Sequence, residues 1–150
     1  MSTVEYADVA SFCNEHLPPG SRILIHDAGY LSYATKFPLT DMVGLKTPSS
    51  VEFHKDLTYP SNGKDRVVAI SKIAASSHAN YMIVIGSWEI MFHISDGLRS
   101  KGWSVEPVRV PNGLNPLRLS ATDGFDHYTI YRISHSDASS PERKRAAIGR

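Results

Sequence analysis

The first quarter of the chain alternates between apolar runs and polar breaks. Within residues 2–17, five apolar side chains recur near one side of a helix: Val4, Val9, Phe12, Cys13 and Leu17. This spacing predicts an amphipathic helix that begins with a capping box of Ser2 and Glu5 and ends before Pro18. Residues 22–26 follow and leave neither face polar, which is typical of a strand covered by helices on both sides.

A short helix and a short second strand are predicted next. Residues 29–37 are long enough for one or two helical turns, and residues 38–41 predict a second strand parallel to the first. Residues 46–64 are rich in Pro, Ser, Asn and Gly. Because so long a loop is uncommon in a compact domain, we expect this segment to be helical around residues 51–57, mobile or functional.

The second half of the chain continues the alternation. Hydrophobic spacing predicts a helix over residues 65–77, a central strand over 80–86, and a helix over 88–101 that Ser87 caps. Three further segments are predicted as strands: 103–110, 116–121 and 127–133. Together these elements predict an α/β fold with a three-layer, Rossmann-like mixed sheet, mainly parallel with an antiparallel C-terminal edge.

Composition narrows the class of protein. The 150 residues suffice for one domain that buries about 70% of its unfolded surface, and we expect that domain to span residues 1–134, before a disordered basic tail over 135–150. With 41% hydrophobic residues and a net charge of +1, neither disorder nor nucleic-acid binding is favoured. The lone Cys13 excludes an internal disulfide, and the longest apolar run, residues 81–86, is far shorter than the roughly 20 residues of a membrane helix.

Two aspartates mark the ends of the first two predicted strands. Asp27 and Asp41 are each followed within three residues by a glycine, Gly29 and Gly44. Neighbouring parallel strands end at the same edge of a sheet, where ligands bind, so this pair could hold a divalent cation or divide acid and base roles. Alternatively, each aspartate accepts hydrogen bonds from the turn that follows it. We favour this second interpretation because it is the commoner role of Asp before glycine.

Other chemical motifs are weak. The chain has no dinucleotide fingerprint and no phosphate-binding loop, its seven histidines lack the spacing of a zinc site, and Ser87 lacks the second glycine of a nucleophile elbow. We therefore expect no cofactor and no metal, and histidines that lie at the surface or are satisfied in the core. Tyr30, Tyr33 and Trp88 either stack on a sugar ring or pack at the edge of the core, which is the commoner role.

The stretch "LPPGSRILIHDAGYLSYATKFPLTDMVGLKTP" carries a spaced pattern of prolines, Asp-x-Gly, aromatic residues and Asp-hydrophobic-x-Gly-Leu. Its positions are Pro18, Pro19, Asp27, Gly29, Tyr33, Asp41, Gly44, Leu45 and Pro48. The pattern resembles the segment after the last membrane helix in bacterial polytopic glycosyltransferase-like proteins of the dolichyl-phosphate-mannose protein mannosyltransferase type. The resemblance covers residues 5–110 and departs from the family at Ala28 and in the basic tail.

This resemblance implies a soluble extracytoplasmic domain without the membrane helices that carry the catalytic residues of such proteins. We accordingly expect a non-catalytic accessory or ligand-binding domain at the extracytoplasmic face of a bacterial membrane, with a sugar or polyprenyl-phosphate sugar as candidate ligand. The candidate cleft consists of Asp27, Gly29, Tyr30, Tyr33, Asp41, Gly44 and Trp88. Two alternatives stay open: a small metal-dependent enzyme that uses Asp27 and Asp41, and a protein-docking module with an exposed apolar patch near residues 46–64.

Overall fold

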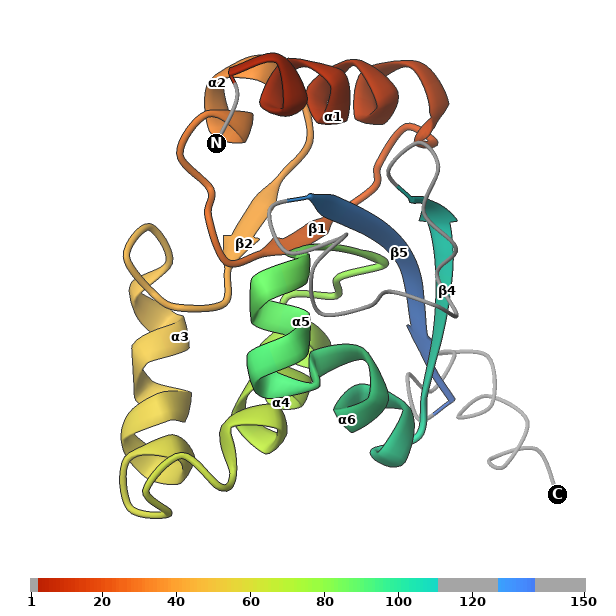
Figure 1. The fold of residues 1–150 in the computed structure, drawn as a ribbon. Helices are drawn as coiled ribbons and strands as arrows, with labels where there is room; N and C mark the ends of the chain where they lie inside the picture. The colour runs from red at the N-terminus through yellow and green to blue at the C-terminus, as the bar shows by residue number, and fades with distance from the viewer. Residues whose placement is uncertain (1–2, 111–126, 137–150) are drawn as a thin grey trace, which may run out of the picture.

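A computed structural model describes residues 3–110 and 127–136 of the chain and shows a five-stranded sheet with helices around it (Figure 1). The strands are β1 (Ile23–Ile25), β2 (Leu39–Asp41), β3 (Tyr81–Ile85), β4 (Trp103–Arg109) and β5 (Tyr128–His135). All five are confirmed predictions, although β5 extends past the expected end of the domain at residue 134. The strand predicted over residues 116–121, and the tail from residue 137 on, lie outside the described residues.

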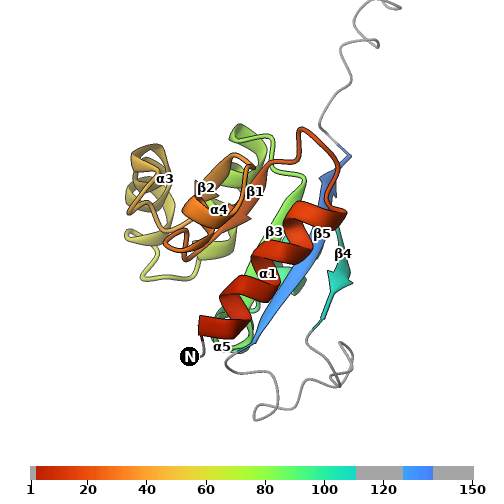
Figure 2. The ribbon, with the colours of Figure 1, turned by 90° about the horizontal axis from the view of Figure 1, so that it is seen from above.

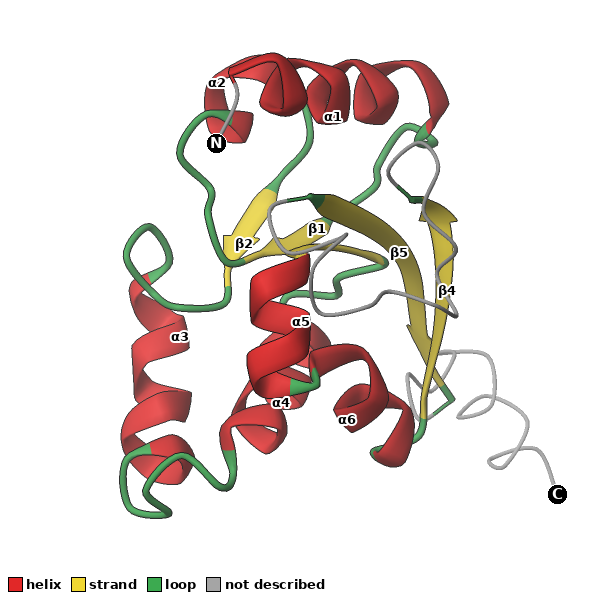
Figure 3. Cartoon of the chain, viewed as in Figure 1, coloured by secondary structure: helices red, strands yellow, loops and turns green. Residues whose placement is uncertain are grey.

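The helical elements account for most of the remaining described chain (Figure 3). They are α1 (Thr3–His16), α2 (Leu31–Ala34), α3 (Pro48–Phe53), the π-helix η1 (His54–Thr58), α4 (Arg66–Ser76), α5 (Gly86–Phe92) and α6 (Ile94–Ser100). The helix expected around residues 51–57 is confirmed, since α3 and η1 together cover it. Over the described ranges, none of these helices combines the length and apolar character needed to span a bilayer.

The sheet is mixed, with strand order β2-β1-β3-β5-β4. β1 pairs in parallel with β2 and with β3, whereas β5 is antiparallel to both β3 and β4, so only β5 runs against the other four strands. The prediction of a mixed sheet with an antiparallel C-terminal edge is confirmed, because β4 and β5 pair antiparallel at one edge, but the prediction that the sheet is mainly parallel is wrong. The antiparallel ladders, with five and six residue pairs, are longer than the two parallel ladders of three pairs each, and the reversed strand lies inside the sheet.

The burial of the side chains explains why β5 and not β4 occupies the interior. Tyr128, Thr129, Ile130 and Tyr131 are all buried, as expected for a strand with neighbours on both sides and helices on both faces. In β4, by contrast, the buried Trp103 and Val105 alternate with exposed residues, and residues 106–108 are all exposed. A half-polar strand of this kind suits the solvent-facing edge of a sheet.

Helices cover both faces of the sheet and form two cores. Alternate side chains of each strand point to opposite faces, so Ile23 and Ile25 pack with α1 and α2 while Leu24 packs with α4 and α6. Figure 2 shows α1 lying along one face of β3 and β5. The expected three layers are therefore present, with helix, sheet and helix in that order.

The helix predicted over residues 88–101 differs from the structure at its start and in its middle. The helix expected to begin after a Ser87 cap begins at Gly86, directly after β3, and no side chain caps it. It also breaks at His93, which adopts the left-handed conformation (φ 48°) and separates α5 from α6. At the start of α1, the carboxylate of Glu5 accepts a hydrogen bond from the backbone N–H of Tyr128 (2.9 Å) and so joins α1 to β5. The capping box predicted for Ser2 and Glu5 lies in part outside the described residues, because Ser2 is not among them.

Candidate functional site

Asp41 organises the turn that follows β2. The residue is 2% exposed. Its Oδ1 accepts a hydrogen bond from the N–H of Val43 (2.8 Å), and its Oδ2 accepts one from the N–H of Lys46 (2.9 Å). The backbone N–H of Asp41 donates in turn to Oγ1 of Thr47 (2.9 Å). Both carboxylate oxygens therefore bind backbone groups of the following turn, which is the arrangement expected for a turn-capping aspartate.

Gly44 is required by the same turn for two reasons. Its φ of +105° lies in the region that side chains disfavour, and a Cβ atom at this position would lie 2.5 Å from Cγ2 of Val51. The turn therefore brings the chain after β2 into close contact with α3. Asp41 and Gly44 act together here as structural residues, holding the start of α3 against the end of the strand.

Asp27 has partners of a different kind. Its Oδ2 accepts a hydrogen bond from the hydroxyl of Tyr6 (2.9 Å) in α1, whereas its Oδ1 lies 3.3 Å from the N–H of Gly29. Burial raises the pKa of the Tyr6 phenol, and the Asp27 carboxylate raises it further. Within the described ranges, Asp27 and Asp41 share no hydrogen-bonding partner, and no group of three or more His, Cys, Asp or Glu side chains is placed to hold a metal ion.

His26 lies at the carboxyl end of β1 and links it to β3. Its Nε2 accepts a hydrogen bond from the N–H of Ile85 (3.1 Å), so the neutral ring carries its proton on Nδ1. The ring stacks on the indole of Trp88, with centroids 4.4 Å apart and planes 10° apart. Burial lowers the pKa of His26 to about 4, although the charges of Asp27 and Asp41 oppose this effect. A neutral imidazole thus fixes the position of Trp88.

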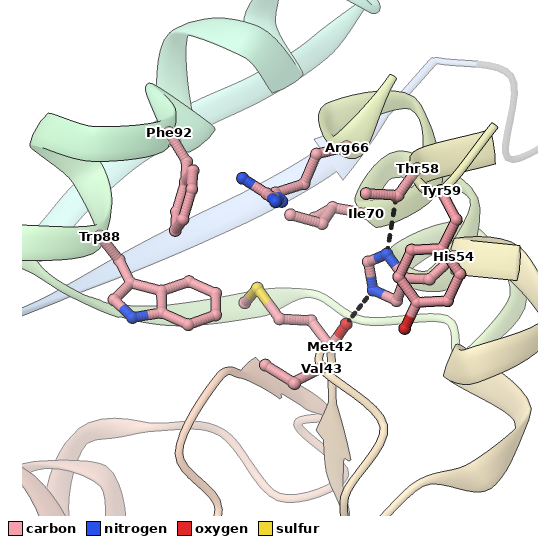
Figure 4. A pocket seen from close by; sticks show the side chains of 9 residues that line it. All are labelled: Met42, Val43, His54, Thr58, Tyr59, Arg66, Ile70, Trp88 and Phe92. Carbon is pink, nitrogen blue, oxygen red and sulfur yellow. Dashed lines mark hydrogen bonds between the residues drawn. The ribbon is translucent and has the colours of Figure 1, made fainter. Parts of the chain in front are cut away.

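Trp88 also forms one wall of a pocket of about 180 Å³ between β2, η1, α4 and α5 (Figure 4). The pocket is lined by Met42, Val43, His54, Thr58, Tyr59, Arg66, Ile70, Trp88 and Phe92. Figure 4 shows Trp88 and Phe92 on one side and His54, Thr58 and Tyr59 on the other, with Met42 and Val43 between them. The body of the pocket is therefore apolar and aromatic, and its polar groups come from η1 and α4.

His54 is a buried part of the pocket wall with both ring nitrogens occupied. Nε2 lies 2.7 Å from the carbonyl oxygen of Met42, and Nδ1 lies 2.8 Å from Oγ1 of Thr58. Because a carbonyl only accepts, Nε2 must donate, and Nδ1 of the neutral ring accepts the hydroxyl proton of Thr58. The expectation of a satisfied core histidine is confirmed at this position. His54 fixes the π-helical turn against the end of β2, and such turns occur frequently at functional sites.

Arg66 is the cation of the pocket. Its guanidinium carbon lies 4.1 Å from the centroid of the Phe92 ring, in the geometry of a cation–π contact. No hydrogen bond or ion pair joins the guanidinium to any other residue of the described chain. Arg66 and Phe92 also line a neighbouring depression of about 370 Å³, to which Lys64 contributes a second cation. Over residues 3–110 and 127–136, no acidic residue lines either hollow.

The residues predicted to form one cleft lie in different parts of the structure. Trp88 lines the pocket, whereas Asp41 and Gly44 shape the turn beside it. Tyr30 packs its ring against Tyr6 of α1 (5.8 Å between centroids). Asp27 lies in the same region, where it accepts hydrogen bonds from the hydroxyl of Tyr6 and from the N–H of Gly29. Tyr33 is 87% exposed, with Nζ of Lys46 5.2 Å from its ring centroid.

Sequence reasoning missed most of the pocket. One local signal was present, because Trp88 and Phe92 are four residues apart and therefore share a face of α5, where their rings meet edge to face (5.1 Å). Arg66, His54 and Met42 reach the pocket from three other elements, and no spacing in the chain relates them to one another. Their proximity depends on the way β2, η1 and α4 pack together.

The fold and the pocket define an α/β domain with a mixed five-stranded sheet and a small aromatic pocket beside the carboxyl ends of two parallel strands. The chain belongs to the family described as Domain of unknown function (DUF8728), whose model matches residues 2–131. No curated protein and no solved structure matched the chain.

Proposed function

We propose that this chain is a ligand-binding domain without catalytic activity of its own, and that the pocket beside Trp88 is its binding site. The observation that carries the proposal is the place of the pocket, which lies next to the carboxyl ends of β2 and β3, where α/β sheets commonly bind ligands. Its volume of about 180 Å³ suits a ligand with one ring. Apolar cavities of roughly 150 Å³ hold a benzene molecule.

The hydrogen bonds of the titratable groups favour binding over catalysis. A general acid or base needs an atom that can exchange a proton with the substrate. Both carboxylate oxygens of Asp41 accept backbone N–H groups of the following turn, and both ring nitrogens of His54 are engaged by Met42 and Thr58. These groups hold the pocket in shape, which a preformed binding site requires.

A sugar or a polyprenyl-phosphate sugar stays a candidate ligand in this proposal. The aromatic faces of Trp88 and Tyr59 support it, because sugar rings stack on such faces. A function as the extracytoplasmic accessory domain of a membrane glycosyltransferase-like protein remains a prediction that is supported by the sequence pattern from Pro18 to Pro48 alone. The order β2-β1-β3 supports, in the same way, a relation to doubly wound Rossmann-like sheets.

The two tryptophans of the chain provide the test. Trp88 lines the pocket, whereas the indole N–H of Trp103 donates to Oγ of Ser71 (2.8 Å) in another part of the core. In ¹H–¹⁵N NMR spectra, monosaccharides and single-ring aromatic compounds should be added one at a time. We expect at least one of these ligands to shift the indole signal of Trp88 and to leave that of Trp103 unchanged.

A variant that fills the pocket distinguishes specific binding from surface adsorption. Val43→Phe places a larger side chain in the pocket, and Val108→Phe makes the same change at an exposed position of β4. The ligand-induced shift of Trp88 should disappear in the first variant and persist in the second. Shifts that survive Val43→Phe, or a Trp88 signal that no compound moves, would contradict the proposed binding site.

A further inference from the structure

The strongest unexplained feature near the pocket is the guanidinium of Arg66. A buried or half-buried arginine normally pairs with a carboxylate or a carbonyl oxygen, since its five N–H donors are costly to leave without acceptors. Arg66 is half-buried and its backbone N–H donates to the carbonyl oxygen of Gly63, yet within the described chain its guanidinium contacts only the Phe92 ring. That contact leaves the N–H groups of the guanidinium without a hydrogen-bond acceptor among the described residues.

The cation–π contact with Phe92 also restricts the position of the guanidinium. At 4.1 Å from the ring centroid, the flat cation lies at the boundary between the apolar pocket and the neighbouring depression, both of which Arg66 and Phe92 line. A side chain held in this way loses less conformational entropy when it binds a ligand. The donors are thus oriented in advance at the mouth of an apolar pocket.

The surrounding charge favours an anion at this boundary. Lys64 lines the same depression as Arg66, and no aspartate or glutamate is among the described residues that line either hollow. The planar fork of an arginine matches the paired oxygens of a carboxylate or phosphate. Asp65 stands between the two cations in the chain but is not among the residues that line either hollow. The lining itself therefore provides two cations whose charge is complementary to an oxyanion.

We infer that the ligand of this pocket is an amphiphilic anion, whose ring or other apolar part lies against Trp88 and Phe92 and whose carboxylate or phosphate is bound by Arg66. This inference rests on the proposed function, because it assigns the chemical class of ligand to the same pocket. Arg66 forms the principal contact to the anion, and the more mobile Lys64 adds attraction across the depression. The apolar part determines where the ligand sits, and the charge determines which ligands are accepted.

Two compounds of nearly equal shape test the charge requirement. Phenylacetate carries a carboxylate where phenylacetamide carries a neutral amide, and both contain the single ring that the pocket accommodates. By calorimetry or NMR titration at neutral pH and low salt, we expect phenylacetate to bind about tenfold more tightly than phenylacetamide, since a charge-assisted hydrogen bond is roughly twice as strong as a neutral one. Phenyl phosphate, titrated in parallel, distinguishes a preference for phosphate from one for carboxylate.

Substitution of Arg66 locates the effect. Arg66→Met keeps an unbranched side chain over Phe92 and removes the charge, whereas Lys72→Met makes the same charge change at an exposed position of α4 outside the pocket. The tenfold preference should vanish in Arg66→Met and persist in Lys72→Met. Arg66→Lys retains the charge but not the planar guanidinium, so this variant should keep only part of the preference for phenylacetate over phenylacetamide. Unchanged binding of phenylacetamide to Arg66→Met would show that the pocket itself is intact.

The outcomes separate this inference from the proposed function. If phenylacetate and phenylacetamide shift the Trp88 signal with equal affinity, the pocket binds ligands but the requirement for an anion is wrong. If the preference for phenylacetate survives in Arg66→Met, the anion binds elsewhere and the assignment to Arg66 is wrong. If none of the three compounds shifts the Trp88 signal of the unaltered protein, both the inference and the binding pocket are refuted.

Discussion

Protonation of His26 should destabilise the fold as the pH falls below about 6.5. The neutral ring accepts the N–H of Ile85 through Nε2 and stacks on Trp88, so a proton on Nε2 would break the link between the ends of β1 and β3. Burial lowers the pKa of His26 from 6.5 to about 4 in the folded protein. The unfolded chain takes up the proton at higher pH than the folded protein does. The contribution of neutral His26 to the free energy of unfolding is therefore fully present above pH 6.5 and is lost as the pH falls through 4.

The size of this effect follows from the two pKa values. At about 1.4 kcal/mol for each pH unit, the fall from 6.5 to about 4 corresponds to about 3 kcal/mol of folding free energy. At pH 5 only part of this is lost, about 2 kcal/mol, because the folded protein is still largely unprotonated at His26. A loss of this size is a substantial fraction of the stability of an ordinary domain, about 5–15 kcal/mol.

Urea unfolding at about pH 8 and about pH 5 measures this contribution. His26→Gln removes the titrating ring but keeps an oxygen that can accept the N–H of Ile85, and His16→Gln makes the same change at an exposed histidine of α1. Between the two pH values, the wild-type protein and His16→Gln should lose about 2 kcal/mol more than His26→Gln. Equal losses in all three proteins would refute the assignment of a lowered pKa to His26.

Three further predictions concern the turn after β2 and the core. Asp41→Asn should lower the free energy of unfolding by about 2 kcal/mol, because one buried backbone N–H loses its acceptor. Asp27→Asn should lower it by less, because Asp27 is less buried, and urea titrations of both variants measure the difference. Gly44→Ala should destabilise by about 2 kcal/mol or more, because of the positive φ and the contact with Val51, and a midpoint equal to that of the wild type would contradict this. Burial raises the pKa of Cys13 to about 11, so the folded protein should not react with a thiol reagent at about pH 8 until urea unfolds it.

The local part of the fold was predictable from the sequence. The apolar run Ile23–Ile25 and the amphipathic spacing of α1 and α4 each depend on residues that are close in the chain, and these elements were predicted nearly at their observed bounds. The parallel pairing of β1 with β2 was also predictable, because a short helix connects them. Asp41 was predicted to cap its own turn, and the hydrogen bonds to Val43 and Lys46 agree with that interpretation.

The features that the sequence did not reveal depend on distant contacts. The position of β5 between β3 and β4 is fixed by pairing of residues about 50 and about 30 positions apart, and no local pattern specifies such a pairing. The break at His93 was also missed, because the apolar spacing continues through it from α5 into α6. Predicting the pocket would have required both local spacing and distant contacts. Nothing in the sequence around Arg66 marks it as a pocket residue, and only the structure shows its contact with the Phe92 ring.

The place of β5 in the sheet has a consequence for the order in which the protein can fold as it is synthesised. β3 and β4 have no contact as neighbouring strands, and they are joined only when Tyr128–His135 pairs with both. Until the ribosome has released that segment, the edge of β3 carries unpaired backbone groups and can pair with another chain. A nascent chain that stalls before Tyr128 therefore exposes an incomplete sheet, and we expect chaperones to protect this protein mainly in the interval before its last strand emerges.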